Sequence, residues 1–303
     1  MIVTPKNPTM HIAILTGGIS TERAVALRSG DHMNNWVHIA WHTSDLYDFP
    51  TGLPDFLVKY QTYDLVIPVF HGIYGEDGQI TAFLETLECK YAYSDHEVHA
   101  LCIDKNLTNI YIETIGTMIP ESYLIAKNSP IPSLGEFPLI VKPNKWGSSL
   151  GTSKVKNQAE LIAASKAITD DDILVQECIE GREFTVGVYR DTIGYHALPI
   201  IEIRTLSQDF FDYSEKYETD GSNEVFMEWE TDLQKRLSSE SLLICEYVRT
   251  GWVVRIDWRY DGSDLYFLEV NTIPGFTSGS LVPKMWKQAG KTEGEFVEML
   301  TNQ

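Results

Sequence analysis

The first hundred residues carry two short apolar runs, each followed by a glycine-containing turn and then a helix-compatible stretch. The apolar runs cover 10–15 and 65–70, and the helical patterns follow at 21–32 and 79–87. This repetition of strand, turn and helix predicts a parallel sheet covered by helices. Because ligands of such sheets bind beyond the carboxyl ends of the strands, we expect the turns at 16–18 and 71–78 to border a binding site.

The pattern downstream predicts more strands than helices. The expected strands cover 137–141, 173–176, 184–189, 253–258 and 266–273, and one further helix is expected at about 158–168. Residues 207–229 form a polar and aromatic connection, which at that length is unusual in a compact domain and often serves as a lid. With 303 residues the chain exceeds the usual size of one hydrophobic core, so we expect two or three domains.

Two strands near the carboxyl end place polar groups on matching faces. Side chains of a strand alternate between faces, so Arg255 and Asp257 lie on one side of the first strand. Glu269 and Asn271 share a side of the second in the same way. The short connection at 259–264 contains Asp-Gly, which predicts an antiparallel hairpin that brings the oxygen donors together. Such donors suit magnesium held jointly with substrate phosphates; a cross-strand ion pair on a solvated surface is the alternative.

A candidate phosphate site follows the strand at 137–141. The segment KPNKWGSSLGTSK at 142–154 places Lys142 before a loop rich in glycine and serine. Backbone N–H groups of such a loop form an anion-binding concavity, and the lysine adds a positive charge. A plain Gly/Ser turn is the alternative, because these residues are common turn formers. The segment matches neither the P-loop nor the dinucleotide fingerprint, and no serine-hydrolase elbow or zincin motif occurs in the chain.

Glu22 and His71 are the corresponding candidates in the first segment. Glu22 follows Gly17-Gly18, and His71 stands at the end of the second apolar run. Both therefore fall where a parallel sheet presents its ligand-binding loops. A capping or solvated side chain is the alternative for each of them.

Composition narrows the class of protein. The formal charge of -19 argues against nonspecific binding to nucleic acid or anionic membranes and favours small-molecule partners. The first residues do not resemble a signal peptide, and no apolar run is long enough to cross a membrane. Four scattered cysteines without metal-ligand spacing fit core positions in a reducing cytoplasm.

Seven motifs in order along the chain resemble those of the D-alanine–D-alanine ligases, a family of the ATP-grasp superfamily. They are GGISTER (17–23), HGIYGEDG (71–78), KPNKWGSSLG (142–151), EGREFTV (180–186), FFDYSEKY (210–217), RID (255–257) and EVNTIPGFTSGSLVP (269–283). Because the motifs cover nearly the whole chain, the resemblance is more specific than any one of them.

The resemblance implies a fold of mixed α/β (α+β) class, the three-domain ATP-grasp fold. A Rossmann-like, parallel-sheet, substrate-binding domain would cover 1–103, and a central ATP-grasp subdomain 104–187. A C-terminal catalytic domain would cover 188–303, with a mobile loop at about 207–229. The implied enzyme phosphorylates the carboxylate of one D-alanine with ATP. The amine of a second D-alanine then attacks the acyl phosphate, which yields the dipeptide for peptidoglycan, ADP and phosphate.

The resemblance also implies partners and residue roles. Two Mg²⁺ ions, with Mn²⁺ as an alternative, a cytoplasmic location, a homodimer and ATP and D-alanine as small-molecule ligands are typical of the family. Its ATP-binding residues correspond here to Lys105, Lys142, Ser149, Glu177, Glu183 and Lys216, and its metal ligands to Asp257, Glu269 and Asn271. Its catalytic residues correspond to Glu22, Ser148, Tyr217, Arg255, Gly275 and Ser280, and its substrate-binding residues to His71, Lys216 and Ser280.

Within that assignment, Glu22 would hold the ammonium of the first D-alanine, with His71 near its carboxylate. Arg255 and the backbone N–H of Gly275 would stabilise the tetrahedral intermediate. Lys216 and Ser280 would meet the carboxylate of the second substrate, while Tyr217 closes onto Ser148 and Glu22 to exclude water.

The chain departs from the family pattern at several positions. Gln176, Trp146 and Phe211 stand where other residue types are usual, and the segment after Tyr217 differs as well. Two alternatives therefore accompany the ligase hypothesis. One is a related ATP-grasp ligase that joins D-alanine to another D-amino or D-hydroxy acid; the other is a catalytically silent nucleotide-binding regulator.

Overall fold

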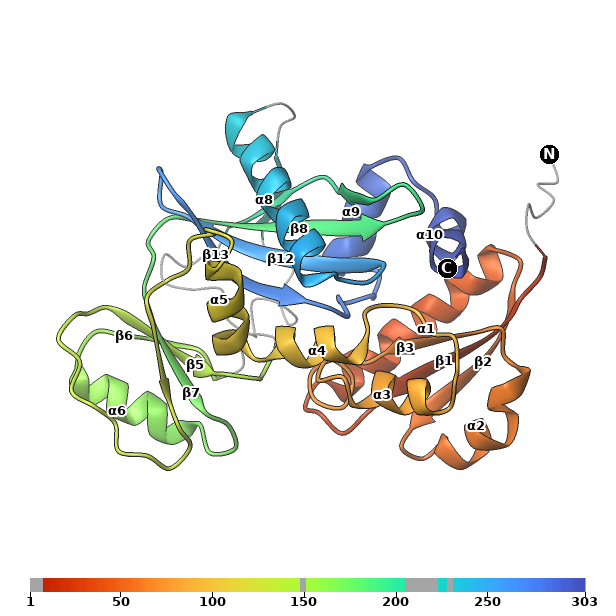
Figure 1. Ribbon diagram of the computed structural model, residues 1–303, viewed down its shortest axis with the longest axis horizontal. Coiled ribbons are helices and arrows are strands. Elements are labelled where there is room, and N and C mark those ends of the chain that lie inside the picture. Colours follow the sequence, from red (N-terminus) through yellow and green to blue (C-terminus); the bar gives the residue numbers. More distant parts are fainter. Residues whose placement is uncertain (1–7, 148–150, 205–222, 228–230, 303) are drawn as a thin grey trace.

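The computed structural model describes residues 8–147, 151–204, 223–227 and 231–302 (Figure 1). Three sheets follow one another along this part of the chain, and each is covered by its own helices. Figure 1 shows the first sheet with α1 to α3, the sheet of β5 to β7 with α6, and the largest sheet beneath α8. The predicted mixture of a parallel α/β unit and antiparallel units is confirmed.

The first sheet is parallel, as the repeated strand–turn–helix pattern predicts. Its strands are β1 (His11–Gly17), β2 (Thr43–Phe49) and β3 (Leu65–Val69), in the order β2-β1-β3. Its helices are α1 (Arg23–Ile39), α2 (Leu53–Lys59) and α3 (Gln79–Thr86), with a 3₁₀ turn η1 (Tyr60–Thr62). The next helix, α4 (His96–Ile103), packs into the core of the third sheet. Helix α1 begins two residues later than predicted and extends to Ile39. Gly17 and Gly18 both have positive φ, which turns the chain between β1 and α1.

The second sheet is antiparallel and lies against a single helix. Its strands are β4 (Ser122–Ile125), β5 (Leu139–Pro143), β6 (Ser153–Val155) and β7 (Ile173–Glu177), in the order β4-β7-β5-β6. Val141 and Val175 pack with Leu161 of α6 (Gln158–Ala167) in one apolar core. Since strand side chains alternate, Lys142 lies on the face of the sheet away from α6. Helix α5 (Lys105–Glu113) precedes this sheet and is capped by the Asp104 side chain.

The third sheet is antiparallel and supports the carboxyl-terminal hairpin. Its strands are β8 (Arg182–Arg190), β9 (Tyr195–Ala197), β10 (Ile201–Arg204), β11 (Asn223–Phe226), β12 (Val253–Tyr260) and β13 (Leu265–Asn271). Helix α8 (Asp232–Val248) packs on one face, where Leu237 and Ile244 meet Phe184 and Trp258. The opposite face therefore carries the side chains that alternate with these, Asp257 among them.

One expectation needs correction. The stretch 207–229 is not a loop throughout, because β11 lies within it and pairs with β10. Sequence reasoning missed this strand because strand pairing depends on partners that are distant in sequence. Strand β8 covers the expected domain boundary at 187–188 and pairs along its whole length with β12 in the third sheet.

The last two helices connect the third sheet to the first. Helices α9 (Leu281–Gln288) and α10 (Glu293–Thr301) follow β13, and Figure 1 shows α10 beside α1. The Phe296 ring lies 5.3 Å from the Trp36 ring and 4.9 Å from the Phe276 ring, in one buried cluster. This cluster holds the turn after β13 against α1.

The cysteines and the helix lengths bear on two further expectations. All four cysteines are free thiols; Cys102 and Cys245 are buried as predicted, whereas Cys89 and Cys178 are only partly buried. Among the helices that the structure describes, none is long and apolar enough to span a bilayer.

Candidate active site

Arg255, Asp257, Glu269 and Asn271 meet on the face of the third sheet opposite α8. The hairpin of β12 and β13 has the predicted antiparallel pairing and sets Asp257 directly across from Glu269. The Arg255 guanidinium donates two hydrogen bonds to Asp257, from Nε at 2.9 Å and from Nη2 at 2.8 Å. Asn271 Nδ2 donates to Asp257 at 3.2 Å and to Glu269 at 3.5 Å. The convergence predicted from strand alternation is present, with Arg255 bound to the same carboxylate.

Two further groups fix these carboxylates. The Thr185 hydroxyl, on neighbouring β8, donates to Asp257 Oδ1 at 2.6 Å, and both residues are buried. Lys105, the first residue of α5, lies with its Nζ 3.4 Å from Glu269 Oε2 and donates to the Trp146 carbonyl at 2.7 Å. Lys105 thereby links the candidate phosphate loop to the carboxylates of the hairpin.

The acidic donor set fits magnesium rather than a metal bound by protein alone. Among the described residues, no three His, Cys, Asp or Glu side chains form a metal-binding group. Asp257 and Glu269 supply two carboxylates, and Asn271 supplies an amide whose oxygen and nitrogen exchange places on a half-turn. Magnesium is commonly bound by one or two carboxylates together with substrate phosphates. The residues present therefore fit this ion when a nucleotide completes the coordination.

Glu22 lies where two glycine-containing loops approach it. It is 6% exposed and precedes the first turn of α1. A Cβ on Gly72 would come within 3.0 Å of Glu22 Oε2, and one on Gly147 within 3.1 Å. Larger residues at either glycine would push against the carboxylate, so the close approach of both loops requires small residues there.

Glu76 is a third carboxyl group at this place, and it was not among the predicted site residues. Its Oε2 accepts a hydrogen bond from the Gly72 N–H at 2.6 Å. Burial, together with the negative charge of Glu22, raises the pKa of Glu76 to about 8, against the opposing effect of the Gly72 hydrogen bond. The charge of Glu269 also raises this pKa, whereas the charge of Arg255 lowers it. Glu76 thus belongs electrostatically to the same site, and its place in the HGIYGEDG segment was the available signal.

The turn after β13 leaves the backbone N–H of Gly275 available. Pro274 has no N–H. The N–H of Phe276 donates to Ser29 Oγ at 3.3 Å, and the N–H of Thr277 donates to Ser280 Oγ at 2.9 Å. Among the residues that the structure describes, the N–H of Gly275 has no hydrogen-bond acceptor. Gly275 is thus a donor in this turn that a bound molecule can use.

His71 lies in the wall of the site, at the end of β3. It is 6% exposed, its Nε2 is 3.0 Å from Ser29 Oγ, and its ring also hydrogen-bonds the backbone of Ile273. Burial, together with the positive charge of Arg255, lowers the pKa of His71 to about 4, and the Ile273 hydrogen bond opposes this shift. The ring is therefore neutral at physiological pH. Protein groups engage both of its nitrogens, so His71 supports the turn after β13.

Glu183 lies on the same face of the sheet as Asp257. The two side chains share this face because β8 and β12 pair with Thr185 opposite Asp257. Arg259 Nη1 donates to Glu183 Oε2 at 3.2 Å, and its Nε donates to the Ile179 carbonyl at 3.2 Å. Arg259 was also absent from the predicted site. The two-residue spacing between Asp257 and Arg259 was the signal that could have identified it.

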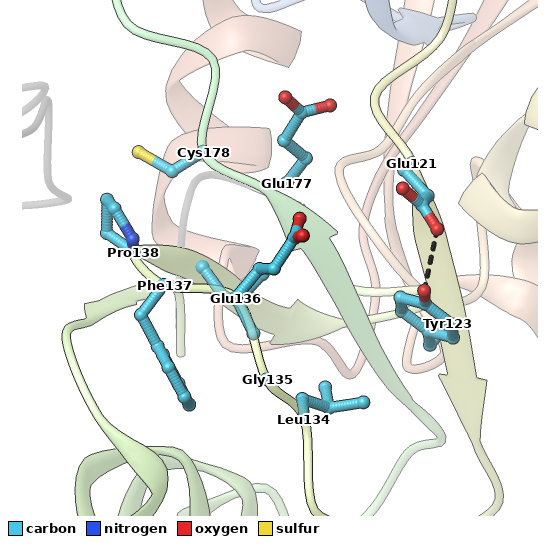
Figure 2. A pocket seen from close by; sticks show the side chains of 10 residues that line it. Glu121, Tyr123, Leu134, Gly135, Glu136, Phe137, Pro138, Glu177 and Cys178 are labelled. Carbon is cyan, nitrogen blue, oxygen red and sulfur yellow. Dashed lines mark hydrogen bonds between the residues drawn. The ribbon is translucent and has the colours of Figure 1, made fainter.

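Glu177 is the last residue of β7 in the second sheet. It pairs with Leu139, so its side chain shares the α6 face of the second sheet and not the face of Lys142. Figure 2 shows its carboxylate beside those of Glu121 and Glu136 at a pocket of about 530 Å³. Alternation therefore places the side chains of Glu177 and Lys142 on opposite faces of the second sheet.

Four predicted site residues lie outside the described part of the chain. These are Ser148, Ser149, Lys216 and Tyr217. Ser280 is described, immediately before α9, and its hydroxyl lies 2.9 Å from that of Thr277.

Comparison with known proteins places the chain among ligases. The family model described as "D-ala D-ala ligase C-terminus" matches residues 126–302. The D-alanine–D-alanine ligase of Coprothermobacter proteolyticus is 34% identical over 96% of this chain and 98% of its own length. The crystal structure of the Bacillus anthracis D-alanine–D-alanine ligase complexed with ATP aligns with a TM-score of 0.83 and 26% identity, covering 96% of each chain. The crystal structure of the VanG D-Ala:D-Ser ligase of Enterococcus faecalis aligns with a TM-score of 0.79 and 26% identity. The alignment covers 97% of this chain and 98% of that protein's chain.

The parallel α/β unit, the two antiparallel units and the charged groups gathered between them define an ATP-grasp ligase. Within that class, two findings identify the family: the family model covers more than half of the chain, and the sequence identity to a relative extends over 96% of it. The chain belongs to the D-alanine–D-alanine ligase family. The predictions of the family, the fold class and the ligase function are confirmed.

Proposed function

We propose that this protein joins two D-alanine molecules for peptidoglycan synthesis through an acyl phosphate made from ATP. The observation that carries the proposal is the meeting of Arg255, Asp257, Glu269 and Asn271 on one face of paired strands, with Lys105 beside them. Carboxyl activation by ATP needs cations around the transferred phosphoryl group and oxygen ligands for magnesium. This cluster supplies both kinds of group.

Lys105 and Lys142 bind the phosphates of ATP in this proposal. Ser149, in the segment between Lys142 and β6, binds them as well. Lys105 already contacts the Trp146 carbonyl of that segment, which supports its place there. Glu183 binds the ribose from the face of β8, and Arg259 holds its carboxylate in position. The similar Bacillus anthracis ligase crystallised as a complex with ATP, which supports the same nucleotide here. Glu177 contributes through its backbone.

Asp257, Glu269 and Asn271 hold two magnesium ions, or manganese ions, in this proposal. When bound, magnesium neutralises the charge on the phosphates and on the transferred phosphoryl group. Arg255 then remains beside Asp257, where its forked guanidinium can also meet the oxygens of the reacting carboxylate. Thr185 keeps Asp257 oriented through its hydroxyl.

Glu22 holds the ammonium of the first D-alanine. This role is supported by the burial of the Glu22 carboxylate and by the close approach of Gly72 and Gly147, from two loops, to it. Glu76 adds a second carboxyl group next to it, so an ammonium entering here would meet Glu22 with Glu76 behind it. We place the first carboxylate toward Arg255, with His71 in the adjoining wall.

The amine of the second D-alanine attacks the carbonyl of the acyl phosphate. The bond between nitrogen and carbon forms and a tetrahedral oxyanion develops. The carbonyl returns as the bond from carbon to the phosphate oxygen breaks, and the departing phosphate takes the proton that the amine loses. The N–H of Gly275 and the guanidinium of Arg255 stabilise the oxyanion, and the lack of another acceptor for that N–H among the described residues supports this role. Ser280, at the start of α9, receives the second carboxylate with Lys216. Ser148 and Tyr217 close the site against water.

Three broader assignments complete the proposal. We place the reaction in the cytoplasm, which the four free thiols support, and we take the active form to be a homodimer by analogy with the family. We divide the chain into domains at 1–103, 104–181 and 182–303, with the second boundary moved so that β8 stays in its own sheet.

The decisive experiment measures ADP release and identifies the product by mass, with magnesium, ATP and single or paired D-amino and D-hydroxy acids. D-alanyl-D-alanine is the expected product. The Glu269→Gln variant should lose at least about 100-fold in turnover, whereas Glu246→Gln, exposed on α8, should match the parent. No turnover with any pair would support the silent regulator instead, and near-normal activity of Glu269→Gln would contradict the metal assignment.

The substrate panel should include D-serine as the second substrate. The likeness to the VanG D-Ala:D-Ser ligase is the observation that favours testing it. Turnover that requires D-alanine together with D-serine or a D-hydroxy acid would assign the protein to the related ligases.

A further inference from the structure

A chain of hydrogen bonds joins α1 to the turn after β13, at a place that no predicted role explains. The N–H of Phe276 donates to Ser29 Oγ at 3.3 Å, and Ser29 Oγ lies 3.0 Å from His71 Nε2. Ser29 has no exposed surface and Phe276 has 1%. The three residues come from α1, from the end of β3 and from the turn after β13, and only the fold brings them together.

The direction of each bond follows from the donors available. A backbone N–H can only donate, so the Ser29 oxygen accepts from Phe276. The hydrogen bond to the Ile273 backbone favours the protonated form of the His71 ring, so the ring donates to that carbonyl. His71 Nε2 is then left as an acceptor for the Ser29 hydroxyl. Ser29 therefore accepts one bond and donates another, which alanine cannot do.

These bonds hold the turn on both sides of Gly275. Ser29 ties the following residue, Phe276, and His71 ties Ile273, two residues before Gly275. The Phe276 ring is fixed as well, 4.6 Å from the Trp36 ring of α1. The peptide group that carries the Gly275 N–H thus lies between two anchored residues, and both anchors depend on the Ser29–His71 pair.

We propose that Ser29 is a positioning residue of the ligase, whose hydroxyl sets the orientation of the Gly275 N–H through Phe276 and His71. The inference rests on the oxyanion role proposed for Gly275. Because the oxyanion exists only in the tetrahedral state, a misaligned donor lowers kcat and leaves ground-state binding of ATP nearly unchanged. A purely structural role would instead show as lost stability alone.

The test compares Ser29→Ala and Ser29→Cys with Ser241→Ala. Ser241 is an equally buried serine whose hydroxyl oxygen accepts from Trp258 Nε1 at 2.9 Å, on the α8 side of the third sheet. Its variant therefore removes a buried hydrogen bond away from the site. For each protein we would measure thermal unfolding, kcat, the KM for ATP, and the inhibition constant of a phosphinate dipeptide analogue, whose tetrahedral phosphorus mimics the intermediate.

Ser29→Ala should lower kcat by about 10- to 100-fold and weaken phosphinate inhibition similarly, while the KM for ATP changes by less than about 3-fold. Ser29→Cys should fall between Ala and the parent, because a thiol is a weaker donor and acceptor, and it decides the question if the alanine variant does not fold. Ser241→Ala should change stability only.

Two results would overturn the inference. One is parental kcat and phosphinate inhibition in both Ser29 variants. The other is a loss of activity in Ser29→Ala that merely parallels its loss of stability and is matched by Ser241→Ala. The parent protein is assayed first, so an inactive parent would refute the proposed function, whereas an active parent with an unaffected Ser29→Ala would refute only the role of Ser29.

Discussion

Glu202 provides the sharpest test of the electrostatics of this fold. It lies on β10, is 6% exposed, and accepts from Arg182 Nε at 2.7 Å and Nη2 at 2.9 Å. Arg204 Nη2 donates to the same carboxylate at 2.7 Å. The hydrogen bonds from Arg182 foremost lower the pKa of Glu202 to about 2, against burial, which acts in the opposite direction. Glu202 pairs across from Phe184, so it lies on the α8 side and away from Asp257.

The expected contribution to stability follows from that pKa. The difference between the ordinary value of 4.5 and a value of about 2 corresponds to about 3.4 kcal/mol. The side chains of Arg182 and Arg204 are 49% and 53% exposed, so solvent screens the interaction. We therefore expect Glu202→Gln to lower the free energy of unfolding by about 2 kcal/mol at pH 7.

The sign of the pH dependence is fixed by the lower pKa in the folded state. Below about pH 5.5 the unfolded chain binds more protons at this carboxyl than the folded protein does, so the stabilisation declines as the pH falls from 4.5 toward 2. At pH 3.5 the contribution of Glu202 to the free energy of unfolding should be about 40% smaller than at pH 7, which leaves about 1.2 kcal/mol.

Urea unfolding followed by tryptophan fluorescence at pH 7 and pH 3.5 would measure both values. Glu113→Gln, exposed on α5, is the matched control and should match the parent at either pH. A difference between Glu202→Gln and the parent that stays constant between the two pH values would refute the reasoning. A difference below about 0.5 kcal/mol at pH 7 would refute it as well, because it would equal that of an ordinary surface pair.

Two further substitutions probe the site and the packing. Thr185→Val removes the hydrogen bond to Asp257 and should raise the magnesium concentration for half-maximal activity about 10-fold; an unchanged magnesium titration would show that Asp257 needs no such support. Gly251→Ala places a Cβ 2.2 Å from the Tyr93 backbone and should lower the free energy of unfolding by about 2–4 kcal/mol. Gly135→Ala, which meets no atom within 4 Å, is its control, and equal melting temperatures of the two variants would contradict the expected clash.

Several parts of the fold were predictable because they depend on neighbours in sequence. Alternation of side chains placed Arg255 with Asp257 and Glu269 with Asn271, and the Asp-Gly turn predicted the hairpin that joins the two strands. The repeated strand–turn–helix pattern predicted the parallel sheet and the loops of Glu22 and His71. The ligase function was predicted from the resemblance of seven motifs to those of the family.

Other features were not predicted, because the periodic pattern of apolar residues does not specify which strands pair or which distant residues meet. Strand β11 is short and finds its place only by pairing with β10. The face on which Glu177 lies depends on the register of β7 against β5. Glu76 gained its raised pKa from burial and from Glu22, a residue 54 positions earlier.

The sequence by itself determined the periodic elements, the order of the motifs and the residues able to bind phosphate and magnesium, because each of these follows from local geometry and side-chain chemistry. Only the tertiary structure decided which groups meet. Ser29 and Phe276 are 247 positions apart and share a hydrogen bond, and Lys105 lies beside Glu269. Such contacts arise when packing of separate units excludes water from between them, and that packing is a property of the whole fold.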